Sequence, residues 1–146
     1  MRLFGHPVHP MLVHVPLALW IVGTACDALT LLGVAGAWPL AWLAILVGLA
    51  AALPAMVAGL ADFARVPEPA GATATRHMLL MALAWSAYLA ALLMRSDGLA
   101  VQPAPARGAM AVSLVAFLLL VAGAAHGGQL VYRLGVGVDS GAGNPR

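Results

Sequence analysis

The stretch PLAWLAILVGLAAALPAMVAGLADF (residues 39–63) is apolar almost throughout, and Asp62 is its one charged residue. The hydrocarbon core of a bilayer is about 30 Å thick, and an α-helix crosses it with roughly 20 consecutive apolar residues. The length and composition of this stretch therefore predict a transmembrane helix. Pro54 lies inside it and predicts a kink.

Three further stretches of the same kind lie at 12–32, 77–94 and 109–130. Of the 146 residues, 63% are hydrophobic and 8% are charged, and the mean hydropathy is +0.98; soluble domains carry about 25% charged residues. Short segments of alternating hydrophobicity, which are typical of membrane β-barrels, do not occur. We predict an all-α integral membrane four-helix bundle with up-down-up-down topology. It forms a single domain over residues 1–146, without an internal repeat.

The first apolar stretch has a competing interpretation as a cleaved signal peptide, because AGA at 35–37 is similar to a small-residue cleavage site. The apolar part of a signal peptide is usually about 7–15 residues long, which is shorter than this stretch. Asp27 also lies within it. We therefore keep the stretch as a transmembrane helix.

The basic residues are all arginines, and they divide unequally between the two ends of such a bundle. The end that holds both termini and the loop at 65–76 carries five of them, and the other end carries Arg95 and Arg107. Positive charge favours the cytoplasmic side of a membrane. We therefore predict a multi-pass protein of the inner (cytoplasmic) membrane with both termini in the cytoplasm. The five arginines of that end are Arg2, Arg65, Arg76, Arg133 and Arg146.

Several classes of function find no support in the residues. The loops are too short for a soluble active site, and no glycine-rich phosphate loop is present. A basic patch that could bind nucleic acid is also missing. These observations favour a binding or electron-transfer role over an enzyme.

All five histidines fall at the predicted cytoplasmic end of the bundle. His6 and His9 each precede a proline, which disfavours helical geometry at the histidine. We therefore predict a stiff extended arm that folds back over the bundle. The other three are His14 at the start of the first helix, His77 at the start of the third, and His126 near the end of the fourth.

Several imidazoles at one depth suit a haem b group, because haem iron takes one or two axial histidines and four-helix bundles build such sites between facing helices. We predict His14 and His77 as the ligands, with His9 and His126 as the reserve pair. Arg76, beside His77, is a candidate partner for the haem propionates. Glycines and alanines on three helices would leave room for a flat macrocycle, although such stripes also serve plain helix packing.

Two alternatives use the same residues. A transition-metal ion such as zinc, copper or iron takes clustered histidines as ligands, which would make the chain a metal-ion binding or transport protein. A structural membrane subunit would use the histidines only for hydrogen bonds near the interface. The candidate ligands of a metal ion are His6, His9, His14, His77 and His126.

Four segments carry a family resemblance: GHPVHPMLVHVPLALW (5–20), LPAMVAGLADF (53–63), RHMLLM (76–81) and GGQLVYRLGVGV (127–138). They resemble a bacterial family of small predicted membrane proteins, domain of unknown function 2231. The resemblance covers nearly the whole chain and implies four transmembrane helices. It also implies a role in redox chemistry, because this domain occurs fused to cytochrome-type or iron–sulfur modules in some bacteria.

Two positions depart from the family pattern. Many members carry a histidine after the Val-Tyr motif, where this chain has Leu134, and His126 stands where some relatives have an ordinary residue. We expect a cytochrome b-like membrane protein that serves electron transfer or the sensing of redox state or haem. The expected partners are membrane lipid and a redox partner or quinone, and a homo-oligomer is compatible with the sequence.

Overall fold

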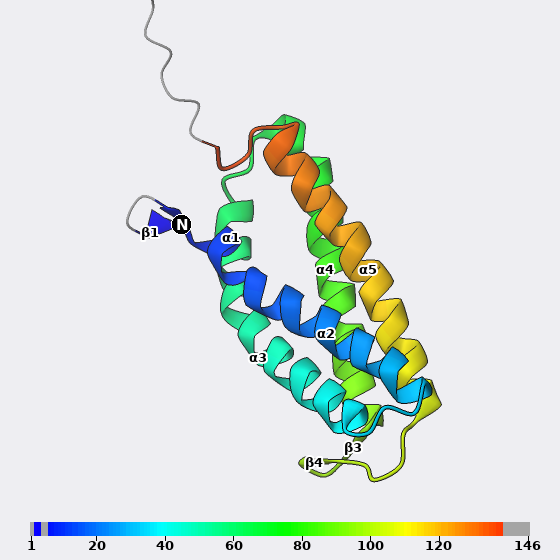
Figure 1. The fold of residues 1–146 in the computed structure, drawn as a ribbon. Coiled ribbons are helices and arrows are strands. Elements are labelled where there is room, and N and C mark those ends of the chain that lie inside the picture. Colours follow the sequence, from blue (N-terminus) through cyan, green and yellow to red (C-terminus); the bar gives the residue numbers. More distant parts are fainter. Residues whose placement is uncertain (1, 4–5, 139–146) are drawn as a thin grey trace, which may run out of the picture.

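The computed structural model describes residues 2–3 and 6–138 (Figure 1). As predicted, it is an all-α membrane bundle of four long helices: α2 (His14–Leu31), α3 (Ala37–Phe63), α4 (Glu68–Met94) and α5 (Arg107–Tyr132). The short helix α1 (Val8–Leu12) leads into α2. Two small antiparallel strand pairs accompany the helices: β1 (Arg2–Leu3) with β2 (His6–Pro7), and β3 (Ser96–Asp97) with β4 (Ala100–Val101).

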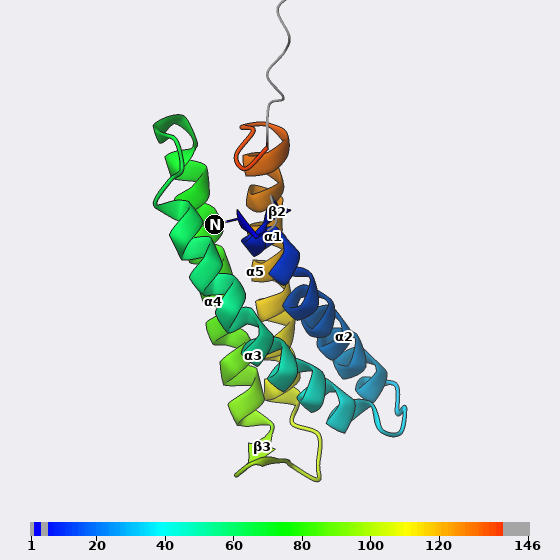
Figure 2. The ribbon, with the colours of Figure 1, turned by 90° about the vertical axis from the view of Figure 1, so that its left-hand side faces the viewer.

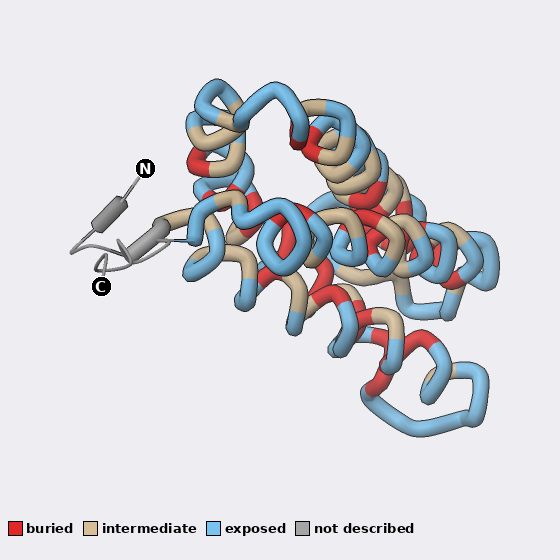
Figure 3. Tube along the Cα trace, turned by 90° about the horizontal axis from the view of Figure 1, so that it is seen from above, coloured by how far each residue is buried: buried red, intermediate tan, exposed pale blue. Residues whose placement is uncertain are grey.

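Each of the four spans is long enough and apolar enough to cross a membrane. Large apolar side chains point outward from the bundle; Leu32 and Val57, for example, are 80% and 71% exposed. In a view down the bundle, the buried positions lie toward its interior and the exposed ones toward its outside (Figure 3). A surface of this kind is solvated by lipid tails and identifies a multi-pass membrane protein.

Helix α4 begins at Glu68, nine residues before the predicted start at 77. The predicted loop at 65–76 is therefore largely helical. Pro69 lies in the first turn, where its missing N–H has no partner to lose, and Glu68 in the same turn complements the helix dipole. His77 consequently lies inside the helix, about 13 Å from its start at a rise of about 1.5 Å per residue.

The helices pack most closely within two hairpins, α2 with α3 and α4 with α5. Both hairpins start at the end of the bundle that holds α1 and turn back at the end that holds β3 and β4 (Figures 1 and 2). The turn between α2 and α3 contains Gly33 and Gly36, both with φ of 80°. Glycine adopts this left-handed geometry without steric cost.

An aromatic pair connects the two hairpins in the middle of the bundle. The rings of Trp20 on α2 and Tyr88 on α4 are stacked, with centroids 4.9 Å apart and planes 16° apart. The Tyr88 hydroxyl donates to the backbone oxygen of Trp20 at 3.3 Å and lies 2.9 Å from the Thr24 hydroxyl. Both rings belong to the main hydrophobic core.

A buried ion pair connects the same two helices nearer the β3–β4 end. Arg95 donates from both terminal nitrogens to the two carboxylate oxygens of Asp27, at 2.8 and 2.9 Å. Its Nε donates to the backbone oxygen of Ala91, and its guanidinium lies 4.8 Å from the centroid of the Trp38 ring. Asp27 is 3% exposed and Arg95 is fully buried, so each charge depends on the other for solvation.

The two residues of each pair are 68 positions apart in the chain. Because residues 68 positions apart face each other in both pairs, we infer that an approximate two-fold axis relates the hairpins. The sequence analysis predicted no internal repeat, whereas these intervals lead us to infer a structural repeat of one helical hairpin. In these two pairs the facing residues differ in type, tryptophan against tyrosine and aspartate against arginine, so they give no sign of a repeat in the sequence.

Candidate functional site

The structure corrects the predicted extended arm at the N-terminal side of the bundle. His9 lies in α1, and only His6, in β2, has extended geometry. Pro10 is tolerated in α1 because the first turn of a helix has no backbone acceptor for its nitrogen. The side chain of His6 lies outside the described part of the structure.

The imidazole of His9 is anchored on α3. Its Nδ1 lies 2.8 Å from the backbone oxygen of Ala55. A carbonyl oxygen can only accept, so Nδ1 carries the proton and Nε2 carries the lone pair. One turn further along α3, a Cβ at Gly59 would come within 2.9 Å of Cε1 and Nδ1 of His9. The glycine therefore makes the space that lets the ring approach the helix.

The imidazole of His77 is anchored on α5 in the same way. Its Nδ1 donates to the backbone oxygen of Gly123 at 2.8 Å, which again leaves the lone pair on Nε2. A Cβ at Gly127 would lie 3.1 Å from Cε1 and Nδ1 of His77. In both hairpins the residue with the acceptor carbonyl lies 46 positions after the histidine. The glycine next to the ring, Gly59 or Gly127, lies one helical turn after that acceptor residue.

The two anchored imidazoles meet at the axis between the hairpins. Their ring centroids are 6.4 Å apart and their planes are 81° apart. Within the described residues, neither Nε2 atom has a hydrogen-bond partner. His9 and His77 are also 68 positions apart, so they form a third facing pair between the hairpins.

The remaining predicted site residues lie around this pair but do not join it. His14 is exposed, and its Nδ1 lies 3.4 Å from the backbone oxygen of Met11. The Nδ1 of His126 donates to Ala122 of its own helix at 2.9 Å. Arg76 precedes His77 on α4 and is exposed. The structure thus brings His9 and His77 together, whereas the sequence predicted His14 and His77 as partners.

Several glycines of the helices lie close to a side chain of a neighbouring helix. A Cβ at Gly48 would lie 2.7 Å from the Trp20 indole, and one at Gly123 would lie 2.8 Å from the sulfur of Met81. Together with the glycines beside the two imidazoles, these positions each receive one side chain from the helix they pack against. They are packing positions: three of them receive a ring, and Gly123 receives the Met81 side chain.

The signal that could have found the neighbouring pair His9 and His77 is the spacing between histidine and glycine. The intervals from His9 to Gly59 and from His77 to Gly127 are equal, and a test for repeats that used only these residue types would have matched the two hairpins. In the described part of the chain, no three His, Cys, Asp or Glu side chains form a group that could hold a metal ion. Among the described residues, the structure thus brings two of the predicted imidazoles together.

Comparison with known proteins identifies the family. A family model described as predicted membrane protein, DUF2231, matches residues 5–140, which include both imidazoles and all four spans. No curated protein and no solved structure matches the chain. The chain belongs to the DUF2231 family of predicted membrane proteins.

Proposed function

We propose that the protein holds one haem b between its two hairpins, with His9 and His77 as the axial ligands, and that it serves electron transfer or haem-linked sensing in the membrane. The observation that carries this proposal is the pair of imidazoles anchored through Nδ1, with both Nε2 lone pairs unused. Histidines that bind metals commonly donate their other ring N–H to a carbonyl in this way. Haem bound there would supply a one-electron iron couple.

The spacing of the rings supports a shared metal. Two imidazoles that each bind one metal ion through nitrogen at about 2 Å hold their ring centres about 6 Å apart, and the centroids of His9 and His77 are 6.4 Å apart. A structural zinc ion takes four protein ligands, whereas haem iron takes one or two. A pair of imidazoles therefore favours haem over a bare ion.

The arginines near the imidazole pair support both the binding of a haem and the placement of this end of the bundle in the cytoplasm. Arg76 is exposed on the turn of α4 that carries His77, where its guanidinium is a candidate partner for a haem propionate. We place the imidazole end of the bundle in the cytoplasm and the protein in the bacterial inner membrane, because arginines are concentrated at this end and positive charge favours the cytoplasmic side.

The deciding experiment is the absorption spectrum and haem content of protein purified in detergent after expression with added haem precursor. We expect iron and protoporphyrin in equal amounts and a low-spin spectrum that responds to dithionite. His9→Ala and His77→Ala should each abolish the six-coordinate spectrum, while the matched variants His14→Ala and His126→Ala should keep it. Zinc or copper without porphyrin in the wild-type protein would overturn the proposal.

The same variants distinguish the observed pair from the predicted one. If His14→Ala lost the haem and His9→Ala kept it, the pair of His14 and His77 would be correct instead. Since loss of an anchored ring can disturb folding, His77→Gly supplies a second measurement. Free imidazole should enter the space left by the side chain and restore the six-coordinate spectrum, which a merely misfolded variant would not do.

The angle between the rings gives an independent spectroscopic test. Low-spin ferric haem with nearly perpendicular axial imidazole planes gives an electron paramagnetic resonance signal whose largest g value is unusually high. Parallel imidazole planes give a rhombic signal instead. The planes of His9 and His77 are 81° apart. We expect the first type of signal, and a rhombic signal would exclude this ring arrangement as the haem site.

A further inference from the structure

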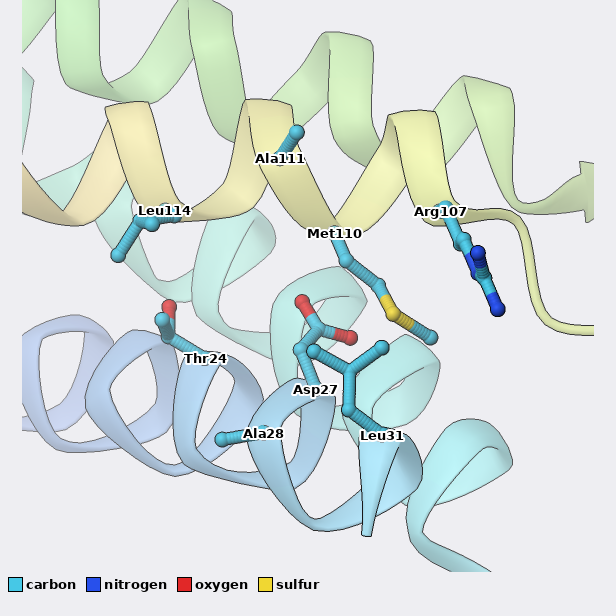
Figure 4. Close-up of a pocket in the computed structure, with 8 residues that line it drawn as sticks. All are labelled: Thr24, Asp27, Ala28, Leu31, Arg107, Met110, Ala111 and Leu114. Atoms are coloured by element: carbon cyan, nitrogen blue, oxygen red, sulfur yellow. The ribbon is translucent and has the colours of Figure 1, made fainter. Parts of the chain in front are cut away.

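A groove runs between α2 and α5 at the end of the bundle opposite the imidazoles (Figure 4). Its volume is ≈ 360 Å³. A second hollow of ≈ 270 Å³ shares Thr24, Ala28 and Leu114 with it and extends it toward Ile21 and Phe117. The two hollows form one continuous groove. The residues that line the first hollow are Thr24, Asp27, Ala28, Leu31, Arg107, Met110, Ala111 and Leu114.

The internal repeat does not explain this groove. The position equivalent to Met110 in the first hairpin is Trp42, because the two lie 68 residues apart. Trp42 donates from its indole nitrogen to the Ser96 hydroxyl at 2.8 Å and so ties α3 to the end of α4. On the α2–α5 side the flexible side chain of Met110 replaces the indole and lines the groove. The opening is therefore a specific difference between the two hairpins.

The two charged residues that line the groove, Asp27 and Arg107, differ in whether their charge is paired within the protein. Asp27 accepts from Arg95 with both carboxylate oxygens, so its charge is neutralised inside the protein. Arg107 is the first residue of α5 and is exposed, and among the described residues no carboxylate pairs with it. In Figure 4 its guanidinium lies at one end of the groove, beyond Met110. The groove thus has apolar walls and one unpaired cation at its mouth.

The length of the groove corresponds to one leaflet of a bilayer. Arg107 and Phe117 are ten residues apart on α5, or about 15 Å along the helix axis, and half of the hydrocarbon core is about 15 Å thick. Arginine at the end of a transmembrane helix extends into the headgroup layer, where its guanidinium can form charge-assisted hydrogen bonds with a lipid phosphate.

We propose that this groove binds an anionic phospholipid, with one acyl chain between α2 and α5 and the phosphate on Arg107. A quinone fits the position less well. Asp27 lies 18 residues from His9, which is about 27 Å along the helices, so an occupant of the groove is remote from the imidazole pair. The assignment of a lipid rests on the groove and on Arg107, and only the argument against a quinone rests on the proposed function.

The test is native mass spectrometry of the purified protein after exchange into micelles doped with equal amounts of phosphatidylglycerol and phosphatidylcholine. We expect the wild-type protein to retain one phosphatidylglycerol. Arg107→Gln should lower its preference over phosphatidylcholine about fivefold, in line with the attraction of one basic residue to an anionic membrane surface, and Arg107→Lys should keep most of the preference. Arg133→Gln, at the other end of α5, is the matched control and should change nothing.

A second variant tests the apolar part of the groove. Ala111→Trp places an indole between α2 and α5 and should expel the bound lipid, whereas Val115→Trp, on an exposed position of the same helix that does not line the groove, should not. The melting temperature of each variant checks that it is folded. Equal retention of both lipids by the wild-type protein, an unchanged preference in Arg107→Gln, or displacement of the lipid by equimolar decylubiquinone would each overturn the proposal.

Discussion

Asp27 and Arg95 occupy equivalent positions in two related hairpins, yet they carry opposite charges and form a buried bidentate ion pair. In a symmetric dimer of identical hairpins, the same two positions would hold like charges and would repel each other. A fused chain can carry a different residue in each half. The ion pair therefore makes the contact between the hairpins complementary, and it gives each hairpin one specific partner.

Removal of one charge of this pair should destabilise the protein strongly. Arg95→Met leaves the Asp27 carboxylate buried without a counter-charge, and Asp27→Leu does the same to the guanidinium. We expect each variant to lose about 3–5 kcal/mol of unfolding free energy, and the double variant to recover much of that loss. Reversible unfolding in mixed micelles measures the effect. Asp97→Asn, at an exposed position of the β3–β4 hairpin, should stay within about 0.5 kcal/mol of the wild type.

Exchange of the two charges should restore only part of the stability. Asp27→Arg combined with Arg95→Asp keeps opposite charges at the facing positions. In the wild-type protein the Arg95 guanidinium also lies over the Trp38 ring, but the position equivalent to Trp38 in the second hairpin is Ala106. We expect the exchanged protein to be more stable than either single reversal and less stable than the wild type by about 1–2 kcal/mol. Stability no better than that of the single reversals would contradict the two-fold relation between the hairpins.

Alanine at the glycines beneath the imidazoles should displace the rings. A Cβ at Gly59 or Gly127 would come within 2.9 or 3.1 Å of His9 or His77, so we expect losses of about 1–3 kcal/mol in unfolding free energy and a lower haem content. Gly128→Ala is the matched control, because its nearest contact, a ring carbon of Tyr132, would be 3.9 Å away. It should be neutral or stabilising by up to about 1 kcal/mol.

The hydroxyl of Tyr88 should contribute to stability through its two hydrogen bonds. Tyr88→Phe keeps the stacking on Trp20 but removes the bonds to the Trp20 carbonyl and the Thr24 hydroxyl. We expect a loss of about 1–2 kcal/mol, measured by the same unfolding assay. Tyr132→Phe should have no effect, because Tyr132 is 89% exposed. Equal stability of the two variants would show that the buried hydroxyl does not contribute.

The arrangement of the spans in the membrane can be tested with reporters. A fluorescent protein fused after α5 should be bright and an alkaline phosphatase at the same place inactive, because we expect both termini in the cytoplasm. The phosphatase inserted into the loop between β3 and β4 should be active. The opposite pattern would move the imidazole pair to the other side of the membrane.

Composition alone determined the class of this protein and the approximate place of its helices. Apolar runs such as residues 39–63 have no stable alternative to a transmembrane helix, because a bilayer offers no partner for unpaired backbone groups. The start of α4 was missed because Pro69 and the glycine and threonines that follow are typical of loops when they are considered individually. In a first helical turn the proline is favoured, and only the packed structure shows that the helix extends back to Glu68.

The tertiary structure decided which side chains meet. The sequence placed the histidines at one end of the bundle, but it could not select His9 over His14, because that choice depends on which helix face each ring reaches. His9 reaches the carbonyl of Ala55 across from α1 because Gly59 leaves space for its ring. The repeat was equally hidden. Of its three facing pairs, His9 and His77 share a residue type, but Trp20 with Tyr88 and Asp27 with Arg95 do not. Only the packing of the two hairpins against each other brings these partners together.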